Sequence, residues 1–180
     1  LPPGATPLYA APEDTLVDVT APDGETHAID DPALIGRLMD GLGGRHTLSL
    51  IRSERSITDC RPVSLFGIQT ARQLGEEAGL AVDPRRFRAN IYLDFSTGKG
   101  FAEDELVGKT IRIGGKVALL VLERDPRCKM ITLDPDTAQP NPDVMRCVAR
   151  NHDGKAGVYA AVLVEGVVSP GDAVAILDRH

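Results

Sequence analysis

No apolar run in the 180 residues approaches the roughly 20 residues that a helix needs to cross a bilayer, so no membrane span is expected. Basic side chains are also few, with 20 Lys and Arg against 26 Asp and Glu. The resulting net charge of -6 argues against a nucleic-acid-binding module, whose binding face is normally basic. The first four residues lack the basic region and the apolar core of a signal peptide.

Cysteine is scarce, and its spacing matches no common framework. Cys60, Cys128 and Cys147 form no CxxC pair and have no zinc-ligand spacing. We therefore expect no disulfide framework and a cytoplasmic location, where thiols stay reduced. Motifs for haem, flavin or iron–sulfur clusters are missing too. Any redox chemistry would need electrons from a partner protein.

The composition is that of an ordinary globular protein, with 42% hydrophobic and 26% charged residues. Near the N-terminus an Asp-Gly turn separates two short strand patterns, 16–20 and 26–29. Asp31 and Pro32 then give the cap and first-turn signals of a short helix. We expect residues 1–45 to form this hairpin and helix, and residues 46–180 to form a larger domain.

The larger domain has many strand patterns and few helical ones. A helix is predicted over 68–78, closed by Gly79, and another after Asn141, with Pro142 in its first turn. Strands are predicted over 47–51, 87–95, 110–113, 116–122, 157–165 and 172–177. With about three short helices in all, the chain is predicted to be an α+β protein dominated by a curved mixed sheet or β-barrel.

The pattern at 87–95 alternates between apolar and polar residues, as in a strand with one buried face. Arg88 and Asn90 would then stand together on the polar face. A guanidinium beside a carboxamide can hold a planar or anionic ligand, because together they supply several fixed donors and an acceptor. The alternative is that Arg88 is solvated or pairs with a neighbour such as Asp94.

Cys128 is the most interesting chemical group, because it follows the apolar run 117–122 and precedes a turn signal at 134–137. This places the thiol near a strand terminus. Arg124, Arg127 and Lys129 are close enough in sequence to lower a thiol pKa, although an extended segment would point Arg127 and Lys129 to the opposite face. The alternative is a buried apolar thiol, a common environment for free cysteine.

Several motifs in order resemble the molybdenum-cofactor sulfurase C-terminal (MOSC) domain family. They are the Arg127-Cys128 pair and segments 87–91, 133–137, 157–160 and 166–172, within a match from about residue 59 to 177. The resemblance implies a MOSC-type barrel that binds the molybdenum cofactor. It makes Cys128 the metal ligand and catalytic thiolate, and it assigns the cofactor to Arg88, Asn90, Asp59, Arg61 and Arg127. The family is also associated with pyridoxal phosphate binding.

The resemblance leaves three functions open. The first is reduction of small N-hydroxylated compounds with an external electron-donor protein. The second is a sulfur-carrier module in which Cys128 holds a persulfide received from a cysteine desulfurase. The third is a degenerate domain without a cofactor, because Cys60, Arg61 and Pro126 depart from the amidoxime-reducing relatives. Those relatives also carry a Tyr-Pro-Val-Lys-Ser type segment that contacts the cofactor phosphate, and this chain begins after it, so a genuine absence of that segment should weaken cofactor binding.

Overall fold

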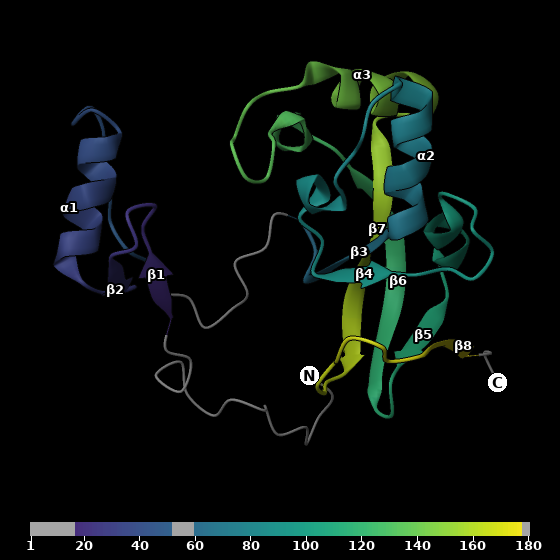
Figure 1. Ribbon diagram of the computed structural model, residues 1–180. Helices are drawn as coiled ribbons and strands as arrows, with labels where there is room; N and C mark the ends of the chain where they lie inside the picture. Colours follow the sequence, from purple (N-terminus) through teal and green to yellow (C-terminus); the bar gives the residue numbers. More distant parts are fainter. Residues whose placement is uncertain (1–16, 52–59, 178–180) are drawn as a thin grey trace. The chain divides into compact units, whose positions relative to one another are not determined.

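The computed structural model describes residues 17–51 and 60–177, which belong to two compact units (Figure 1). In the smaller unit, β1 (Asp18–Thr20) pairs antiparallel with β2 (Thr26–Ala28), and α1 (Pro32–Gly41) follows. The side chain of Asp31 caps α1 by accepting a hydrogen bond from the Ala33 amide. The hairpin and helix predicted from turn and cap signals are therefore confirmed.

One strand prediction at the end of the smaller unit is wrong. Residues 47–51 are irregular and do not form a strand. Leu50 and Ile51 are 50% and 71% exposed, so their apolar side chains have no sheet to pack on. An alternating pattern makes a strand only where a neighbouring strand is available, and none pairs with these residues among those described. The predicted division at residue 45 stays a prediction.

The larger unit is built on a six-stranded mixed sheet that curls into a half-barrel. The order of the strands is β4-β3-β7-β6-β5-β8, and only the β3–β4 pair is parallel. Their bounds are β3 (Val63–Gly67), β4 (Ile91–Leu93), β5 (Thr110–Ile113), β6 (Val117–Pro126), β7 (Lys155–Val164) and β8 (Val174–Leu177). The predicted α+β class with a curved mixed sheet is confirmed.

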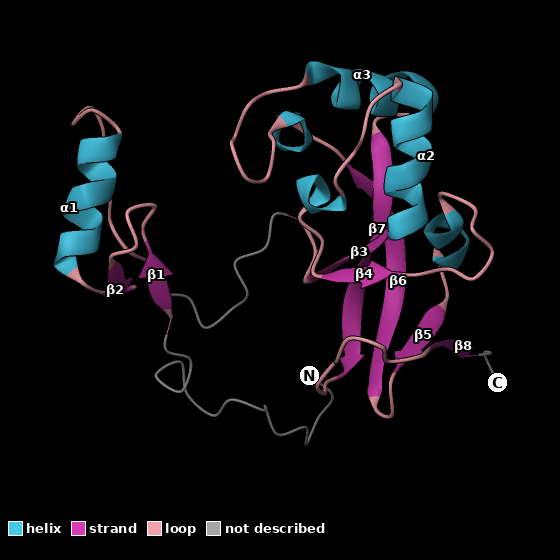
Figure 2. Ribbon diagram, in the orientation of Figure 1, coloured by secondary structure: helices cyan, strands magenta, loops and turns pink. Residues whose placement is uncertain are grey.

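Helices α2 (Ile68–Ala78) and α3 (Pro142–Asn151) pack against the sheet near the ends of its long strands (Figure 2). Both end signals read from the sequence are present. Gly79 closes α2 in the left-handed conformation, at φ 68, and the Asn141 side chain accepts from the Asp143 amide at the start of α3. With α1, these are the three α-helices of the described residues.

The sheet separates two apolar cores. Because successive strand residues point to opposite faces, the fully buried neighbours Leu65 and Phe66 on β3 enter different cores. Leu65 packs with Ile111, Val121 and Val158 on the face without helices, and Phe66 joins the core beneath α2 and α3.

The segment predicted as one strand over 87–95 is different. A 3₁₀ turn, η2 (Pro84–Phe87), comes first, Arg88 follows at φ 52, and β4 covers only Ile91–Leu93. Asp83 caps η2 by accepting from the Arg85 amide, so the Asp-Pro signal sets a helical turn where alternation indicated a strand. Two more 3₁₀ turns, η3 (Ala102–Leu106) and η4 (Lys129–Thr132), were not predicted.

Candidate functional site around Cys128

Cys128 lies between the end of β6 and the start of η4. Its backbone is extended, with φ -115 and ψ -177, and its carbonyl accepts a hydrogen bond from the Ile131 amide at 3.3 Å. The side chain is exposed. The predicted position at a strand terminus is thus what the structure has, and the thiol is not a buried apolar group.

Three arginines join η2 to the segment that follows Cys128. The Arg86 guanidinium donates to the Thr132 carbonyl at 3.0 Å and to the Asp134 carboxylate at 2.9 Å. Arg127 donates to the Phe87 carbonyl at 3.0 Å. The Arg85 guanidinium donates two hydrogen bonds to the Asp136 carboxylate in a bidentate contact, at 2.8 and 2.7 Å. We call these contacts of Arg85, Arg86 and Arg127 the arginine clamp, and it fixes residues 84–87 against residues 127–136.

The acidic turn in the clamp is organised by Asp134. Its Oδ1 accepts from the amides of Asp136 and Thr137 and from the Thr137 hydroxyl, at 3.0 to 3.1 Å. These donors, the Thr137 amide foremost, hold the pKa of the Asp134 carboxyl below its usual value. The motif at 133–137 therefore has a structural role, because it forms the turn whose Asp134 carboxylate accepts a hydrogen bond from Arg86.

The side chain of Arg127 is only 8% exposed, which the sequence did not predict. Its Nε donates to the Ala156 carbonyl at 2.6 Å, and one terminal nitrogen lies 2.8 Å from the buried carboxylate of Asp125. The guanidinium also lies over the rings of Phe66 and Phe87, 5.8 and 5.3 Å from their centroids. Burial lowers the pKa of Arg127, and the charges of Asp125, Tyr159 and Cys128 oppose this shift.

The guanidinium of Arg127 therefore uses its hydrogen-bond donors for contacts within the protein. Its predicted contact with a cofactor stays a prediction, whereas its contact with Phe87 has a clear consequence for the site. Cys128 follows Arg127 in the chain and Arg88 follows Phe87, so each lies one residue from a direct hydrogen bond between the two segments. This hydrogen bond links the segment that carries Cys128 to the segment that carries Arg88, although 40 residues separate Arg127 from Phe87.

Arg88 and Asn90 differ in how free their side chains are. Arg88 is exposed, and its guanidinium has no hydrogen-bond or salt-bridge partner within residues 17–51 and 60–177. In contrast, the Asn90 carboxamide oxygen accepts from the Ser64 amide at 2.8 Å and from the Ser64 hydroxyl at 3.0 Å. Asn90 thus fastens β4 to β3 and keeps only its amide nitrogen for a ligand.

The remaining predicted residues lie elsewhere or are engaged. Arg61 donates from Nε to the Glu123 carboxylate at 2.8 Å, and both side chains are about half exposed. Asp59 lies outside the described residues. Arg124, expected to act on the thiol, pairs instead with Asp104 at 2.9 Å.

Within the part of the chain that the structure describes, no three His, Cys, Asp or Glu side chains come together to hold a metal ion. A metal near Cys128 would therefore have at most two ligands of these types from that part, with the others supplied by a cofactor. A thiolate is a soft donor suited to a metal that is already bound by sulfur. The residues present fit a sulfur-rich metal cofactor on these terms.

The sequence patterns did not predict the structural role of one buried carboxylate. Glu103, in η3, is fully buried and accepts from the Thr70 hydroxyl at 2.8 Å and the Gly67 amide at 3.1 Å. Burial raises the pKa of this carboxyl. Because α2 lacks a side-chain cap of its own, Glu103 supplies one from a distant segment. The only sequence signal was a glycine at the cap position.

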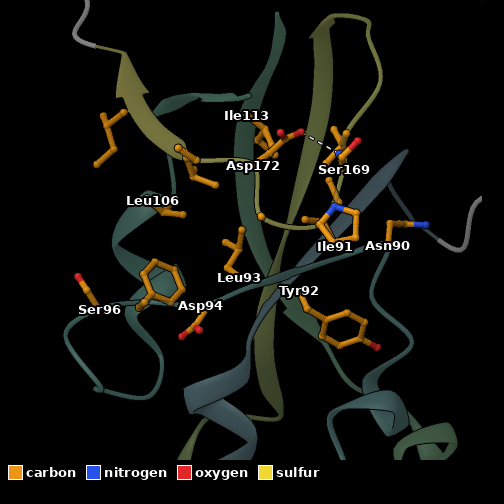
Figure 3. A pocket seen from close by; sticks show the side chains of 17 residues that line it. Asn90, Ile91, Tyr92, Leu93, Asp94, Ser96, Leu106, Ile113, Ser169 and Asp172 are labelled. Carbon is orange, nitrogen blue, oxygen red and sulfur yellow. Dashed lines mark hydrogen bonds between the residues drawn. The ribbon is translucent and has the colours of Figure 1, made fainter. Parts of the chain in front are cut away.

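A cavity of about 830 Å³ lies on the face of the sheet opposite α2 and α3 (Figure 3). Asn90 is the only predicted site residue that lines it, and Cys128 does not. The cavity is therefore distinct from the Cys128 site.

The candidate site thus has an exposed cysteine just after the end of β6, a long strand of the half-barrel. The family model of the MOSC domain matches residues 52–175, and the chain belongs to this family. The resemblance read from the motifs is thereby confirmed.

A curated relative, molybdenum cofactor sulfurase of Drosophila grimshawi, is 34% identical over 123 residues. That match covers 67% of this chain but 14% of the relative, so the chain corresponds to a small part of that protein. Two solved structures have a similar fold. YiiM from Geobacillus stearothermophilus has a TM-score of 0.51 at 22% identity, covering 66% of this chain and 55% of that one. YuaD from Bacillus subtilis has a TM-score of 0.52 at 21% identity, covering 66% and 64%.

No helix of the described residues is long and apolar enough to cross a membrane.

Proposed function

We propose that this chain binds the molybdenum cofactor, with the Cys128 thiolate as the protein ligand of the metal. The observation that carries the proposal is that the Arg127–Phe87 hydrogen bond links two adjacent positions, the exposed thiol of Cys128 and the exposed Arg88, whose guanidinium has no partner among the described residues. The thiolate suits the metal, and the guanidinium suits an anionic group of the cofactor.

Other residues help by positioning. Arg127 holds the Phe87 carbonyl and therefore the backbone that presents Arg88. Asn90 offers its amide hydrogens to an acceptor on the ligand while its oxygen stays on Ser64. Arg61 could contribute only by leaving Glu123, and the predicted role of Asp59 rests on the family resemblance.

The reaction proposed is the two-electron reduction of small N-hydroxylated compounds. The cofactor, when bound, supplies the redox chemistry, and a separate protein supplies the electrons. The chain's own residues would bind and orient the cofactor. Their positions leave the thiol side exposed, which a substrate and an electron donor both require.

A second candidate is favoured by the name of the curated relative, which is a sulfurase. In this function Cys128 carries sulfur as a persulfide that a cysteine desulfurase delivers. An exposed thiol on a short turn is accessible to such a partner.

Metal content distinguishes the two functions. The chain is expressed in a host that makes the cofactor, and the molybdenum-to-protein ratio is measured for the unchanged protein, Cys128→Ala and Cys60→Ala. Cys60 is the matched control, because it is also exposed. We expect bound molybdenum in the unchanged protein and in Cys60→Ala, and its loss in Cys128→Ala.

A metal-free protein that accepts a persulfide on Cys128 from a desulfurase, shown by intact mass, would establish the second function instead. A protein that takes neither molybdenum nor sulfur would reject both.

A further inference from the structure

The 830 Å³ cavity lies between the two ends of the curled sheet (Figure 3). The strand order begins with β4 and ends with β8, so within the described residues each of these strands pairs on one side only. Both contribute residues to the cavity wall. The half-barrel is therefore open along a line where two strand edges, with their unpaired amide and carbonyl groups, border one apolar space.

The floor of the cavity is continuous with the core of the half-barrel. Leu93, Leu106 and Ile113 point into it from β4, η3 and β5, and all three belong to the buried core on this face (Figure 3). On β8, Val174 and Ile176 line the cavity, whereas Ala175 between them does not. This alternation offers an incoming chain a surface that repeats at the period of a strand.

Within the described part of the chain, the free edge of β8 carries none of the features that normally prevent pairing. Proteins protect edge strands with charged side chains, proline or a covering segment. The four residues of β8 are Val174, Ala175, Ile176 and Leu177, with no charge and no proline. Val174 and Ile176 are 43% and 49% exposed, so large apolar side chains at this edge face solvent in the described structure.

The described charges around the cavity are of one sign. Among the described residues, Asp94 and Asp172 are the only charged ones that line it. One oxygen of Asp94 accepts from the Gln69 amide nitrogen at 2.6 Å, and one oxygen of Asp172 accepts from the Ser169 amide at 2.8 Å. Each carboxylate still carries its negative charge at the rim. A cationic flank on the occupant is favoured, and an anionic one is opposed.

From this combination we propose that the gap between β4 and β8 is a docking site for an extended peptide segment of a partner protein, with apolar side chains at alternate positions and a basic flank. The segment adds a strand to the free edge of β8 or β4, buries its apolar side chains on Leu93, Leu106 and Ile113, and places its basic flank near Asp94 or Asp172. A strand that matches the four residues of β8 spans about 13 Å. This site is independent of the Cys128 function.

Fluorescence anisotropy with the complete chain tests the proposal. The probe is a labelled heptapeptide in which alternating valine and threonine are flanked by lysine. Two altered probes are compared, one with methyl groups on alternate backbone nitrogens and one with glutamate in place of lysine. We expect saturable binding of the first probe and at least about tenfold weaker binding of the other two, since one removes edge pairing and the other reverses the charge.

Matched substitutions on β8 locate the site. Ile176→Lys places a charge in the cavity, and Ala175→Lys places the same charge on the opposite face of the same strand. We expect at least about tenfold weaker binding for Ile176→Lys and unchanged binding for Ala175→Lys. Val168→Lys, from the loop that lines the cavity, serves as a second variant if Ile176→Lys fails to fold.

Three results would overturn the proposal. The unmodified probe could fail to bind, as it would if other residues of the chain or a second copy fill the gap. The N-methylated probe could bind equally well, which would indicate an apolar small-molecule pocket without strand pairing. Ala175→Lys could weaken binding as much as Ile176→Lys, which would place the peptide elsewhere.

Discussion

Arg88 and Arg127 carry the same charge, yet their side chains have opposite environments. Arg88 is exposed and has no partner among the described residues. Arg88→Ala should therefore change the free energy of unfolding by no more than about 0.5 kcal/mol. Under the proposed function it should also weaken cofactor retention about tenfold or more, because a charge-assisted hydrogen bond is lost. A thermal melt and a molybdenum-to-protein ratio on the same preparation measure both effects.

Arg127→Ala should have the reverse profile in the melt. The substitution removes the guanidinium from the buried Asp125 carboxylate and from the carbonyls of Ala156 and Phe87. Removing one partner of a buried ion pair costs roughly 3 to 5 kcal/mol. Urea unfolding monitored by circular dichroism would show it. A loss of less than about 1 kcal/mol would mean that Arg127 is not the structural link described here.

The sequence could not separate these two arginines. The resemblance to the MOSC family assigned both to the cofactor. Arg85, Arg86 and Arg127 instead meet Asp136, Asp134 and Asp125. Two of these partners are about 50 residues away, so tertiary structure alone decides which arginine stays free. The exposure of Cys128 was undecided for the same reason.

Glu77 should make the protein sensitive to acid. Although burial alone would raise its pKa, hydrogen bonds from Asn151, Gln73 and His152 lower the pKa of Glu77 from 4.5 to about 2. A lowered folded-state pKa stabilises the protein above the unfolded value, and this contribution disappears as the pH falls from 4.5 toward 2. Between pH 6 and pH 3, Glu77→Gln should lose about 1 to 2 kcal/mol less stability than the unchanged protein. Equal losses in urea titrations would contradict the assignment.

At the scale of single elements, Gly157 in β7 is a tightly constrained strand position. A register shift between Arg124 and Pro126 marks a β-bulge in the β6–β7 pair, and Gly157 lies opposite it at φ +80. A Cβ atom there would lie 2.8 Å from the Leu65 carbonyl oxygen and 2.9 Å from a terminal nitrogen of Arg127. The glycine therefore makes room for the buried guanidinium beside the sheet.

Gly157→Ala should destabilise the protein by about 1 to 3 kcal/mol, because it combines a strained backbone angle with two close contacts. Gly115→Ala is the matched control. It also lies beside a strand of the same sheet, but a Cβ there meets nothing within 4 Å and its φ is not positive. The control should stay within about 0.5 kcal/mol of the unchanged protein. Similar melts for the two variants would show that Gly157 is not required by the bulge.

Elements with strong local signals were predictable. The three helices begin or end at caps that act over two or three residues, and those signals survive in the fold. The segment 87–95 failed as a strand because its alternation, which the burial pattern keeps, also fits a 3₁₀ turn followed by a left-handed residue. The segment 47–51 failed because strand pairing depends on a neighbour that the sequence does not specify.

At the scale of the whole molecule, the three cysteines differ in how deeply they are buried. Cys60 and Cys128 are exposed, whereas Cys147 on α3 is buried in the core beneath α2 and α3. Burial raises the pKa of the Cys147 thiol, and so does the neighbouring Glu77 carboxylate, whose oxygen lies 3.5 Å from the sulfur. Cys147 should therefore be slow to form the reactive thiolate as well as difficult to reach.

A thiol titration with Ellman's reagent should accordingly show two rapid reactions and one slow reaction in the native protein. Cys128→Ala and Cys60→Ala should each remove one rapid reaction, and Cys147→Ala should remove the slow one.

The slow reaction measures the opening of the core between α2, α3 and the sheet, because the sulfur cannot be reached otherwise. Gly157→Ala and Arg127→Ala should therefore speed it up, whereas Arg88→Ala should leave it unchanged. Three rapid reactions in the unchanged protein would mean that this core is open in solution and that Cys128 is not the distinctive thiol of the fold.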